Sequence, residues 1–351
     1  MSNNIKTLDK IFLIIKLMIK HNIFLTKGIL FSALLLFSFS CTTQKSTSIS
    51  GKPELIFQSG FEGTSKVVEE KGTNDYGASL EHIAGKVDSY SKKSDWDKDL
   101  KALTSKGVME VQYTGGDSTK RFAKVIPDPT DPKNSVLQFW LNDSWLASEG
   151  QNKARVQTNL YGIKGGMKEF YQSVRVYLTD DFNAARSFPK RIPWCTIAEF
   201  WNNEWWVEGE KNGFRITVGV GKYTTEESDL HFILEAENAG QKLLWRADYK
   251  ASNVAVPIGK WFTMDYYFKE GNKENGRFYL AITPDGGKKQ VVYDVHDFTH
   301  GSYDQAPNGL TGYNPMKLYT SKELVSYVRA QDKTLQILWD DFKLWKNKKP
   351  E

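Results

Sequence analysis

Short runs in which apolar and polar residues alternate make up most of the chain after residue 53. Alternation with a period of two is typical of a strand with one buried face, and Gly, Asn and Asp separate the runs. Such a series predicts an all-β antiparallel sandwich that forms one domain over residues 54–346. The runs are ELIFQSGFE (54–62), GVMEVQYT (107–114), SVLQFWL (135–141), ARVQTNLY (154–161), EFYQSVRVYL (169–178), CTIAEFW (195–201), FRITVGVG (214–221), LHFILEAE (230–237), KLLWRADY (242–249), KWFTMDYYFK (260–269), RFYLAIT (277–283), KQVVYDV (289–295) and LQILWDDFKLW (335–345).

Two stretches have a helical pattern instead, residues 94–105 and 320–331. In the second, Ser321 precedes an apolar stripe formed by Leu324 and Val328. This spacing predicts a short amphipathic helix capped by the serine.

The alternation also separates a core face from a polar face in each strand, because successive side chains point to opposite sides of a sheet. In the run 260–269, Phe262 and Met264 are expected in the core. The polar faces of three runs carry Arg155, Gln157, Asn159 and Tyr161; Arg175 and Tyr177; and Asp265 and Tyr267.

The stretch EFWNNEWW (199–206) places three tryptophans beside two glutamates. Asn202–Asn203 is a good two-residue hairpin turn, because Asn tolerates a positive φ. In such a hairpin Phe200 and Trp205 would face the core. The outer face would carry Glu199, Trp201, Glu204 and Trp206.

A strand face that mixes Trp and Tyr with Glu, Arg, Gln and Asn suits a sugar. Aromatic rings pack against the C–H faces of a pyranose, and planar polar groups bind its hydroxyls. The alternative is a sheet face covered by a loop or by another protein, since aromatic residues are also enriched at protein interfaces.

The first 41 residues differ from the rest. A mixed apolar and basic run is followed by ILFSALLLFSFS (29–40) and then Cys41. This arrangement is typical of a secretory signal and resembles that of a bacterial lipoprotein, in which Cys41 would be lipidated and become the mature N-terminus. The alternative is an uncleaved membrane anchor, and the start is either Met1 or Met18. Residues 42–53 are then a polar tether, and we expect an exported protein anchored to the bacterial cell envelope, at the outer membrane or cell surface.

Removal of residues 1–41 leaves 42 basic and 41 acidic residues, so the net charge of the chain, +5, comes mainly from the leader. Because nucleic-acid binding needs a basic footprint, we expect no nucleic-acid partner. Cys195 is the only cysteine besides Cys41, and its apolar surroundings predict a buried, inert thiol. We expect a monomer.

Both ends of the body carry a recognisable pattern, FQSGFEG (57–63) and ILWDDFKLW (337–345). With the Gly-x-Trp strand and G-x-F-x-L strand in 257–283, they resemble the concanavalin A-like lectin/glucanase superfamily, which includes jelly-roll polysaccharide lyases. The resemblance implies a concanavalin A-like antiparallel β-sandwich (jelly roll) with adjacent terminal strands. It covers most of residues 54–346 as scattered strand motifs and does not fix the reaction.

The run ARVQTNLY is similar to the R-[ST]-E-L-R strand of jelly-roll alginate lyases, and TIAEFW falls where their Q-[IV]-H strand is expected. A lyase removes the C5 proton of a uronate and expels the 4-oxygen, which needs a carboxylate-neutralising group, a base and an acid. The candidates are Arg155, Gln157 and Asn159 for neutralisation, His231 as base, and Tyr267 or Tyr177 as acid. The candidates for substrate binding are Asn159, Arg175, Tyr177, Trp201, Trp206 and Asp265.

Hydrolysis is the second enzymatic alternative. It needs two carboxylates, and Glu199 and Glu204 would lie diagonally across the proposed hairpin. The Glu-x-Asp-x-x-Glu run of the retaining glucanases is not in the sequence. We therefore place a lyase-like enzyme before a glycoside hydrolase, with a non-catalytic glycan-binding lipoprotein or a structural envelope protein as the alternatives.

No cofactor is required by this chemistry. If the terminal strands are adjacent, Glu62 approaches Asp340 or Asp341, and carboxylates that converge in this way are suitable ligands for a structural calcium ion, for which we name Glu62 and Asp341. The alternative is a pair of solvated acids at the end of a sheet. No His or Cys grouping has zinc spacing, and no phosphate-binding loop is present.

Overall fold

The computed structural model describes residues 51–73, 79–86, 96, 99–113, 119–146, 152–201 and 213–351. The predicted signal, Cys41 and most of the tether lie outside the described residues. Among the described residues, no helix has both the length and the apolar character needed to cross a membrane.

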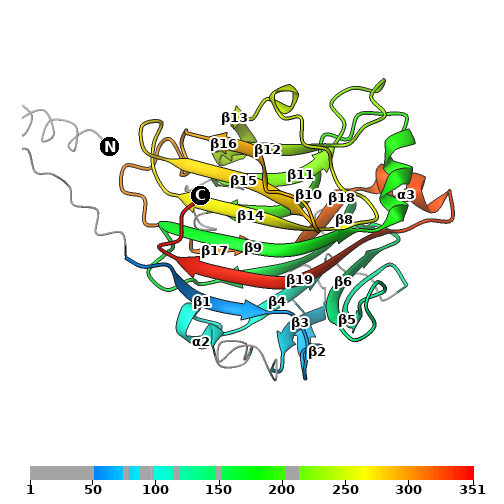
Figure 1. The fold of residues 1–351 in the computed structure, drawn as a ribbon, viewed down its shortest axis with the longest axis horizontal. Coiled ribbons are helices and arrows are strands. Elements are labelled where there is room, and N and C mark those ends of the chain that lie inside the picture. Colours follow the sequence, from blue (N-terminus) through cyan, green and yellow to red (C-terminus); the bar gives the residue numbers. More distant parts are fainter. Residues whose placement is uncertain are drawn as a thin grey trace, which may run out of the picture. The chain divides into compact units, whose positions relative to one another are not determined.

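Residues Ser50–Glu351 form one compact unit built from two antiparallel sheets, an 8-stranded and an 11-stranded one. The predicted all-β antiparallel sandwich is confirmed, and along the chain the strands pass repeatedly from one sheet to the other, as in a jelly roll (Figure 1). The 8-stranded sheet has the order β16-β15-β14-β9-β19-β6-β5, with β1 also pairing with β19. Its strands are β1 (Glu54–Ser59), β5 (Arg121–Pro127), β6 (Ser135–Leu141), β9 (Glu169–Leu178), β14 (Trp261–Lys269), β15 (Arg277–Pro284), β16 (Gln290–Val295) and β19 (Leu335–Lys346).

The 11-stranded sheet has the order β13-β12-β11-β10-β17-β8-β4-β3-β2. In addition, β18 pairs with β10 and β8, and β7 pairs with β8. Its strands are β2 (Lys66–Thr73), β3 (Ser79–Ala84), β4 (Met109–Tyr113), β7 (Trp145–Leu146), β8 (Asn152–Tyr161), β10 (Cys195–Trp201), β11 (Arg215–Gly221), β12 (His231–Asn238), β13 (Lys242–Arg246), β17 (Gly312–Asn314) and β18 (Lys317–Ser321).

The helices in the described residues are short. They are the α-helices α2 (Leu100–Leu103) and α3 (Lys322–Arg329) and the 3-10 helices η1 (Asp180–Ser187), η2 (Ala239–Gln241) and η3 (Tyr249–Ala251). The helix predicted at 320–331 is confirmed as α3: Ser321 Oγ accepts a hydrogen bond from the Leu324 N–H, and its apolar stripe is buried. In the described residues of the stretch 94–105, the single turn α2 is helical.

The core lies between the sheets and is built from the faces that alternation predicts. On β14, Phe262, Met264, Tyr266 and Phe268 belong to the main core, whereas Tyr267 belongs to a separate cluster on the outward face. The expected adjacency of the terminal strands is confirmed, because β1 pairs antiparallel with β19. Since both sheets turn their apolar faces toward this core, their outward faces lie on opposite sides of the sandwich.

Candidate functional site

The outward face of the 11-stranded sheet carries a continuous chain of polar side chains. The chain crosses the sheet from β4 through β8, β17 and β18 to β10, β11 and β12. Each member alternates along its strand with a core residue, so strand geometry places them all on one face. The members are Gln112, Gln157, Asn159, Asn314, Lys317, Glu199, Arg215 and Glu237.

Glu199 is the centre of this chain, although it is only 8% exposed. Arg215 Nη1 donates to Glu199 Oε1 at 3.1 Å, and Lys317 Nζ donates to Glu199 Oε2. Arg215 also donates through Nε to Glu237 Oε2 at 2.7 Å. A buried carboxylate needs partners of this kind to remain ionised.

The charges around Glu199 shift two pKa values. Burial alone would raise the pKa of the Glu199 carboxyl, but the positive charges of Lys317, Arg215 and Arg155 outweigh it and lower the value to about 2. Burial, together with the like charges of Arg155 and Arg215, lowers the pKa of Lys317 to about 8 despite the attraction of Glu199. Three cations, Lys317, Arg215 and Arg155, stand here beside two carboxylates, Glu199 and Glu237, so this group of side chains has one positive charge in excess.

Four amides continue the chain from Lys317. Lys317 Nζ donates to Asn314 Oδ1 at 3.2 Å, and Asn314 Nδ2 donates to Asn159 Oδ1. Gln157 Nε2 donates to Asn159 Oδ1 at 2.7 Å and to Gln112 Oε1 at 3.0 Å. The Gln157 Oε1 atom is buried without a hydrogen-bond partner.

The polar chain runs across the strands, and one aromatic pair lies on each side of it along the strand direction. At one end the rings of Trp201 and Tyr161 are 5.2 Å apart, and at the other those of Trp194 and Tyr319 are 4.6 Å apart. All four are partly exposed. Gly312 leaves room for the first pair, since a Cβ there would lie 2.7 Å from the Trp201 ring.

Tyr319 combines a partly exposed phenol with two cations. Arg155 Cζ lies 5.6 Å and Lys317 Nζ 5.2 Å from the centre of its ring. Both distances are within the range of cation–π contacts. The phenol of Tyr319, which can transfer a proton, therefore lies beside the two cations Arg155 and Lys317 on this face.

Five of the predicted site residues lie together on this face: Arg155, Gln157, Asn159, Glu199 and Trp201. His231 lies on the outward face of the same sheet, where it pairs with Gly221 of β11. The residue of β12 in register with Glu199 is instead Glu235, because both pair with Thr217 of β11. The four-residue offset along β12 is about 13 Å. The imidazole instead lies 4.0 Å from a Glu227 oxygen, so His231 is not positioned as a base beside Arg155.

The predicted hairpin at Asn202–Asn203 is wrong in its register. Trp201 pairs with Arg215 on one side and with Gly312 on the other, so neither edge of β10 is open to Glu204. The parity of β10 nevertheless places Glu199 and Trp201 on the outer face and Phe200 in the core, as predicted. Glu204 and Trp206 lie outside the described residues.

The grouping of Arg175, Tyr177, Asp265 and Tyr267 with these residues is wrong, because all four lie on the outward face of the other sheet. Tyr267 donates to Glu169 Oε1 at 2.7 Å, and its burial raises its pKa. Asp265 is ion-paired with Lys289. Alternation assigned each side chain to a polar face correctly but could not tell the two sheets apart.

Glu62 and Asp341 lie near the junction of β1 and β19, and the charge of Asp341 adds to burial in raising the pKa of Glu62. Asp341 has a positive φ of 46°, at a bulge in the pairing of β19 with β9. Among the described residues, no three His, Cys, Asp or Glu side chains form a group that could hold a metal ion. The calcium site stays a prediction.

Arg215, Asn314, Lys317 and Tyr319 are among the residues of this face that sequence reasoning missed. Arg215 was within reach, since FRITVGVG was identified as a strand and Arg215 falls on its polar parity. Lys317 and Tyr319 lie on β18, whose five residues are too few for a clear period. Asn314 precedes Pro315 and has the sequence signature of a turn.

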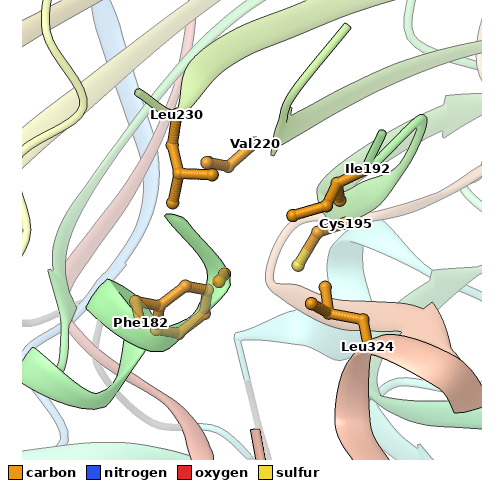
Figure 2. A pocket seen from close by; sticks show the side chains of 7 residues that line it. Phe182, Ile192, Cys195, Val220, Leu230 and Leu324 are labelled. Carbon is orange, nitrogen blue, oxygen red and sulfur yellow. The ribbon is translucent and has the colours of Figure 1, made fainter. Parts of the chain in front are cut away.

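Cys195 is buried, and burial raises the pKa of its thiol to about 12, as expected for an inert cysteine. It lines a cavity of about 10 Å³ with Phe182, Ile192, Val220, Leu230 and Leu324 around it (Figure 2). Every labelled side chain there is apolar or the thiol itself. A space of this size, with no polar partner for a water, is a packing gap and no ligand site.

No protein-family model and no curated protein matches the chain. Among solved structures it is similar to a marine PL-14 alginate lyase from Aplysia kurodai, with 12% identity and a TM-score of 0.42, over 67% of this chain and 89% of that one. It is also similar to an endo-β-1,4-glucuronan lyase from the fungus Trichoderma reesei (11%, 0.39, 67% and 89%). A third is a variant of LamA from Z. galactanivorans in complex with laminaritriose and laminaritetraose (11%, 0.40, 84% and 99%). Similarity at this level assigns no reaction.

Proposed function

We propose that the outward face of the 11-stranded sheet binds an acidic polysaccharide and catalyses β-elimination at a uronate residue. The observation that supports this most directly is the cationic excess around Glu199 on a face lined with amides and aromatic rings. A uronate carboxylate would be attracted by Arg155 and Lys317, and the aromatic pairs at either end would contact the pyranose rings.

In the proposed reaction the enzyme first neutralises the uronate carboxylate, which makes the C5 proton more acidic. Arg155, Gln157 and Asn159 are suited to this step. A base then removes the C5 proton, the C5–H electrons form the C4=C5 double bond, and the C4–O4 bond breaks with protonation of O4. Tyr319 is the partly exposed phenol beside these groups, and we assign it both transfers: as the phenolate it takes the C5 proton, and as the phenol so formed it gives a proton to O4.

Hydrolysis through Glu199 is disfavoured by its surroundings. A carboxyl with a pKa of about 2 cannot serve as a general acid near neutral pH, and both of its oxygens already accept hydrogen bonds from cations. We therefore assign Glu199 a positioning role, in which it holds Lys317 and Arg215 at the face.

The test is the ultraviolet absorbance of the unsaturated uronate, followed while the protein is incubated with a panel of uronate polysaccharides. Tyr319→Phe should lower kcat by about 10²- to 10⁴-fold while binding is retained. Tyr267→Phe is the matched control, because it removes the same hydroxyl from the opposite sheet. If the parent binds uronate chains but forms no unsaturated product from any of them, the protein is a glycan-binding lipoprotein and the enzymatic proposal fails.

We also propose that the protein is exported and held at the cell envelope through acylated Cys41. Each CH2 group of an acyl chain that is buried in the membrane contributes about 0.8 kcal/mol to the free energy of membrane binding. Cys41→Ser should therefore move the protein from the membrane fraction to the soluble fraction or leave an unprocessed precursor, as measured by fractionation and mass spectrometry. Cys195→Ser is the matched control. Retention of Cys41→Ser at its mature size in the membrane would favour another mode of attachment.

A further inference from the structure

A second cavity lies on the 8-stranded sheet, where β9 ends and β14 begins, away from the face described above. Its volume is about 500 Å³, within the usual range for small-molecule sites. Tyr177 and Trp261 come from these two strands, while Pro257 and Pro284 supply apolar walls. Thr130, Lys260, Asp285 and Gln290 also line it.

The aromatic part of the cavity is fixed in place. The Tyr177 and Trp261 rings are 5.4 Å apart, and Trp261 Nε1 donates to Thr130 Oγ1 at 3.1 Å. The Arg175 guanidinium lies 4.7 Å from the centre of the Trp261 ring and is itself paired with Asp285 at 2.6 Å. Trp261 is only 6% exposed, so the partly exposed Tyr177 ring is the surface that a ligand can contact, with Trp261 as its support.

Several polar groups of this cavity have no partner within the described part of the chain. Neither the Tyr177 hydroxyl, the Lys260 ammonium nor the Gln290 amide makes a hydrogen bond or ion pair there. They provide donors and acceptors beside an aromatic ring and two prolines. Rings that contact C–H groups, surrounded by groups that bind hydroxyls, fit a sugar better than they fit a purely apolar ligand.

The charges at this cavity are of the opposite sign to those around Glu199. Arg175 is paired with Asp285 and with Asp340, whose oxygen lies 3.2 Å away, and Lys260 is the second cation. With Asp180 and Asp128, whose charges act on Tyr177, four carboxylates outnumber these two cations. Burial raises the pKa of Tyr177, and the negative charges of Asp180 and Asp128 raise it further. An anionic sugar would be repelled here.

We propose that this cavity is a second glycan-binding site, selective for neutral sugar residues, on the sheet opposite the proposed uronate site. Tyr177 forms its aromatic platform, and Lys260, Gln290 and Asp285 bind hydroxyls at its rim. A protein with both sites would hold a neutral glycan on one side of the sandwich while it acts on an acidic chain on the other.

The test is calorimetric titration of the full-length protein with neutral gluco-, manno- and galacto-oligosaccharides and with oligouronates of matched length. We expect at least one neutral series to bind, and Tyr177→Ala to weaken it by about tenfold or more. Gln290→Ala, at an exposed position, should weaken binding without threatening the fold. Tyr319→Phe should leave neutral-sugar binding unchanged, which separates this site from the proposed uronate site.

The proposal is overturned if no neutral series binds, or if Tyr177→Ala and Gln290→Ala both bind neutral sugars as the parent does. It is also overturned if oligouronates bind in a manner that is lost in Tyr177→Ala but kept in Tyr319→Phe. Failure of uronate turnover alone would contradict the proposed function and leave this second site standing, because the two sites share no residue.

Discussion

At the scale of single residues, Glu199 determines the character of the outer face. Its carboxylate interacts with three cations, Lys317, Arg215 and Arg155, and not with one partner alone. Burial would make such a charge costly, but the surplus of cations keeps the carboxylate ionised and holds the cations in place. The same surplus leaves positive charge for an anionic ligand.

Glu199→Gln should be strongly destabilising, because it leaves Lys317 and Arg215 close together without the charge they share. Loss of one partner from a buried pair costs about 3–5 kcal/mol, measurable by denaturant unfolding. Glu235→Gln is the matched control on the same face, since its partner Arg246 is 46% exposed and the pair should contribute less than about 1 kcal/mol. Equal losses for the two variants would contradict a special role for the buried carboxylate.

The same pair predicts how stability depends on pH. The folded-state pKa of Glu199, about 2, lies below its ordinary 4.5, so its contribution is present above pH 4.5 and is lost as the pH falls toward 2. The pKa of Lys317, about 8, lies below its ordinary 10.5, so the unfolded chain binds more protons between these values and stability should rise across that interval. Unfolding free energies of the parent and of Lys317→Met would test this. The high-pH rise should disappear in the variant, and its persistence would assign the rise to another group.

At the scale of elements, alternation predicted which side of each strand faces the core but not which strands are neighbours. The outer residues of β8 and of β9 have equally polar patterns, yet β8 lies in one sheet and β9 in the other. Arg155 and Arg175 therefore ended on opposite sides of the sandwich, although the sequence grouped them. Sheet membership depends on pairings between strands far apart in sequence, which a local period does not contain. The very short strands β17 and β18 had too few residues to show any period.

Strand β17 sets the position of Trp201 through Gly312. A Cβ at this glycine would lie 2.7 Å from the Trp201 ring and 3.2 Å from that of Tyr161, so Gly312→Ala should displace Trp201 and cost about 1–3 kcal/mol. The measurement is a double-mutant cycle with Trp201→Ala, in which the second substitution should remove most of the cost of the first. Additive effects of the two substitutions would show that the ring does not limit this position.

At the scale of the whole molecule, the first and last strands of the sandwich lie side by side, as the patterns around Phe57 and Asp341 implied. This pairing brings the two ends of the folded unit together, and local features at the junction can therefore stabilise the whole fold. Terminal motifs were predictable because each is a short, distinctive run within a clear strand. The site on the outward face of the 11-stranded sheet was harder to predict from the sequence. Its residues come from β4, β8, β10, β11, β12, β17 and β18 and meet only after folding.

The predicted calcium ion would act at this junction. Burial raises the pKa of Asp340 to about 6, and the charges of Asp341 and Glu62 add to this effect, so the three carboxyls lie within each other's field. A divalent cation held by Glu62 and Asp341 would relieve that repulsion. Because it would bind only the folded chain, it would raise Tm progressively as the free calcium concentration exceeds the Kd. Asp341→Asn is the sharpest variant, because Asn tolerates the positive φ of 46° while it removes the charge. If calcium raises the Tm of the parent relative to a chelator and has no such effect on Asp341→Asn, the ion joins the first and last strands. An equal Tm for the parent in calcium and in chelator would mean that these acids are solvated or paired within the chain, as Asp341 is with Lys343 at 3.5 Å.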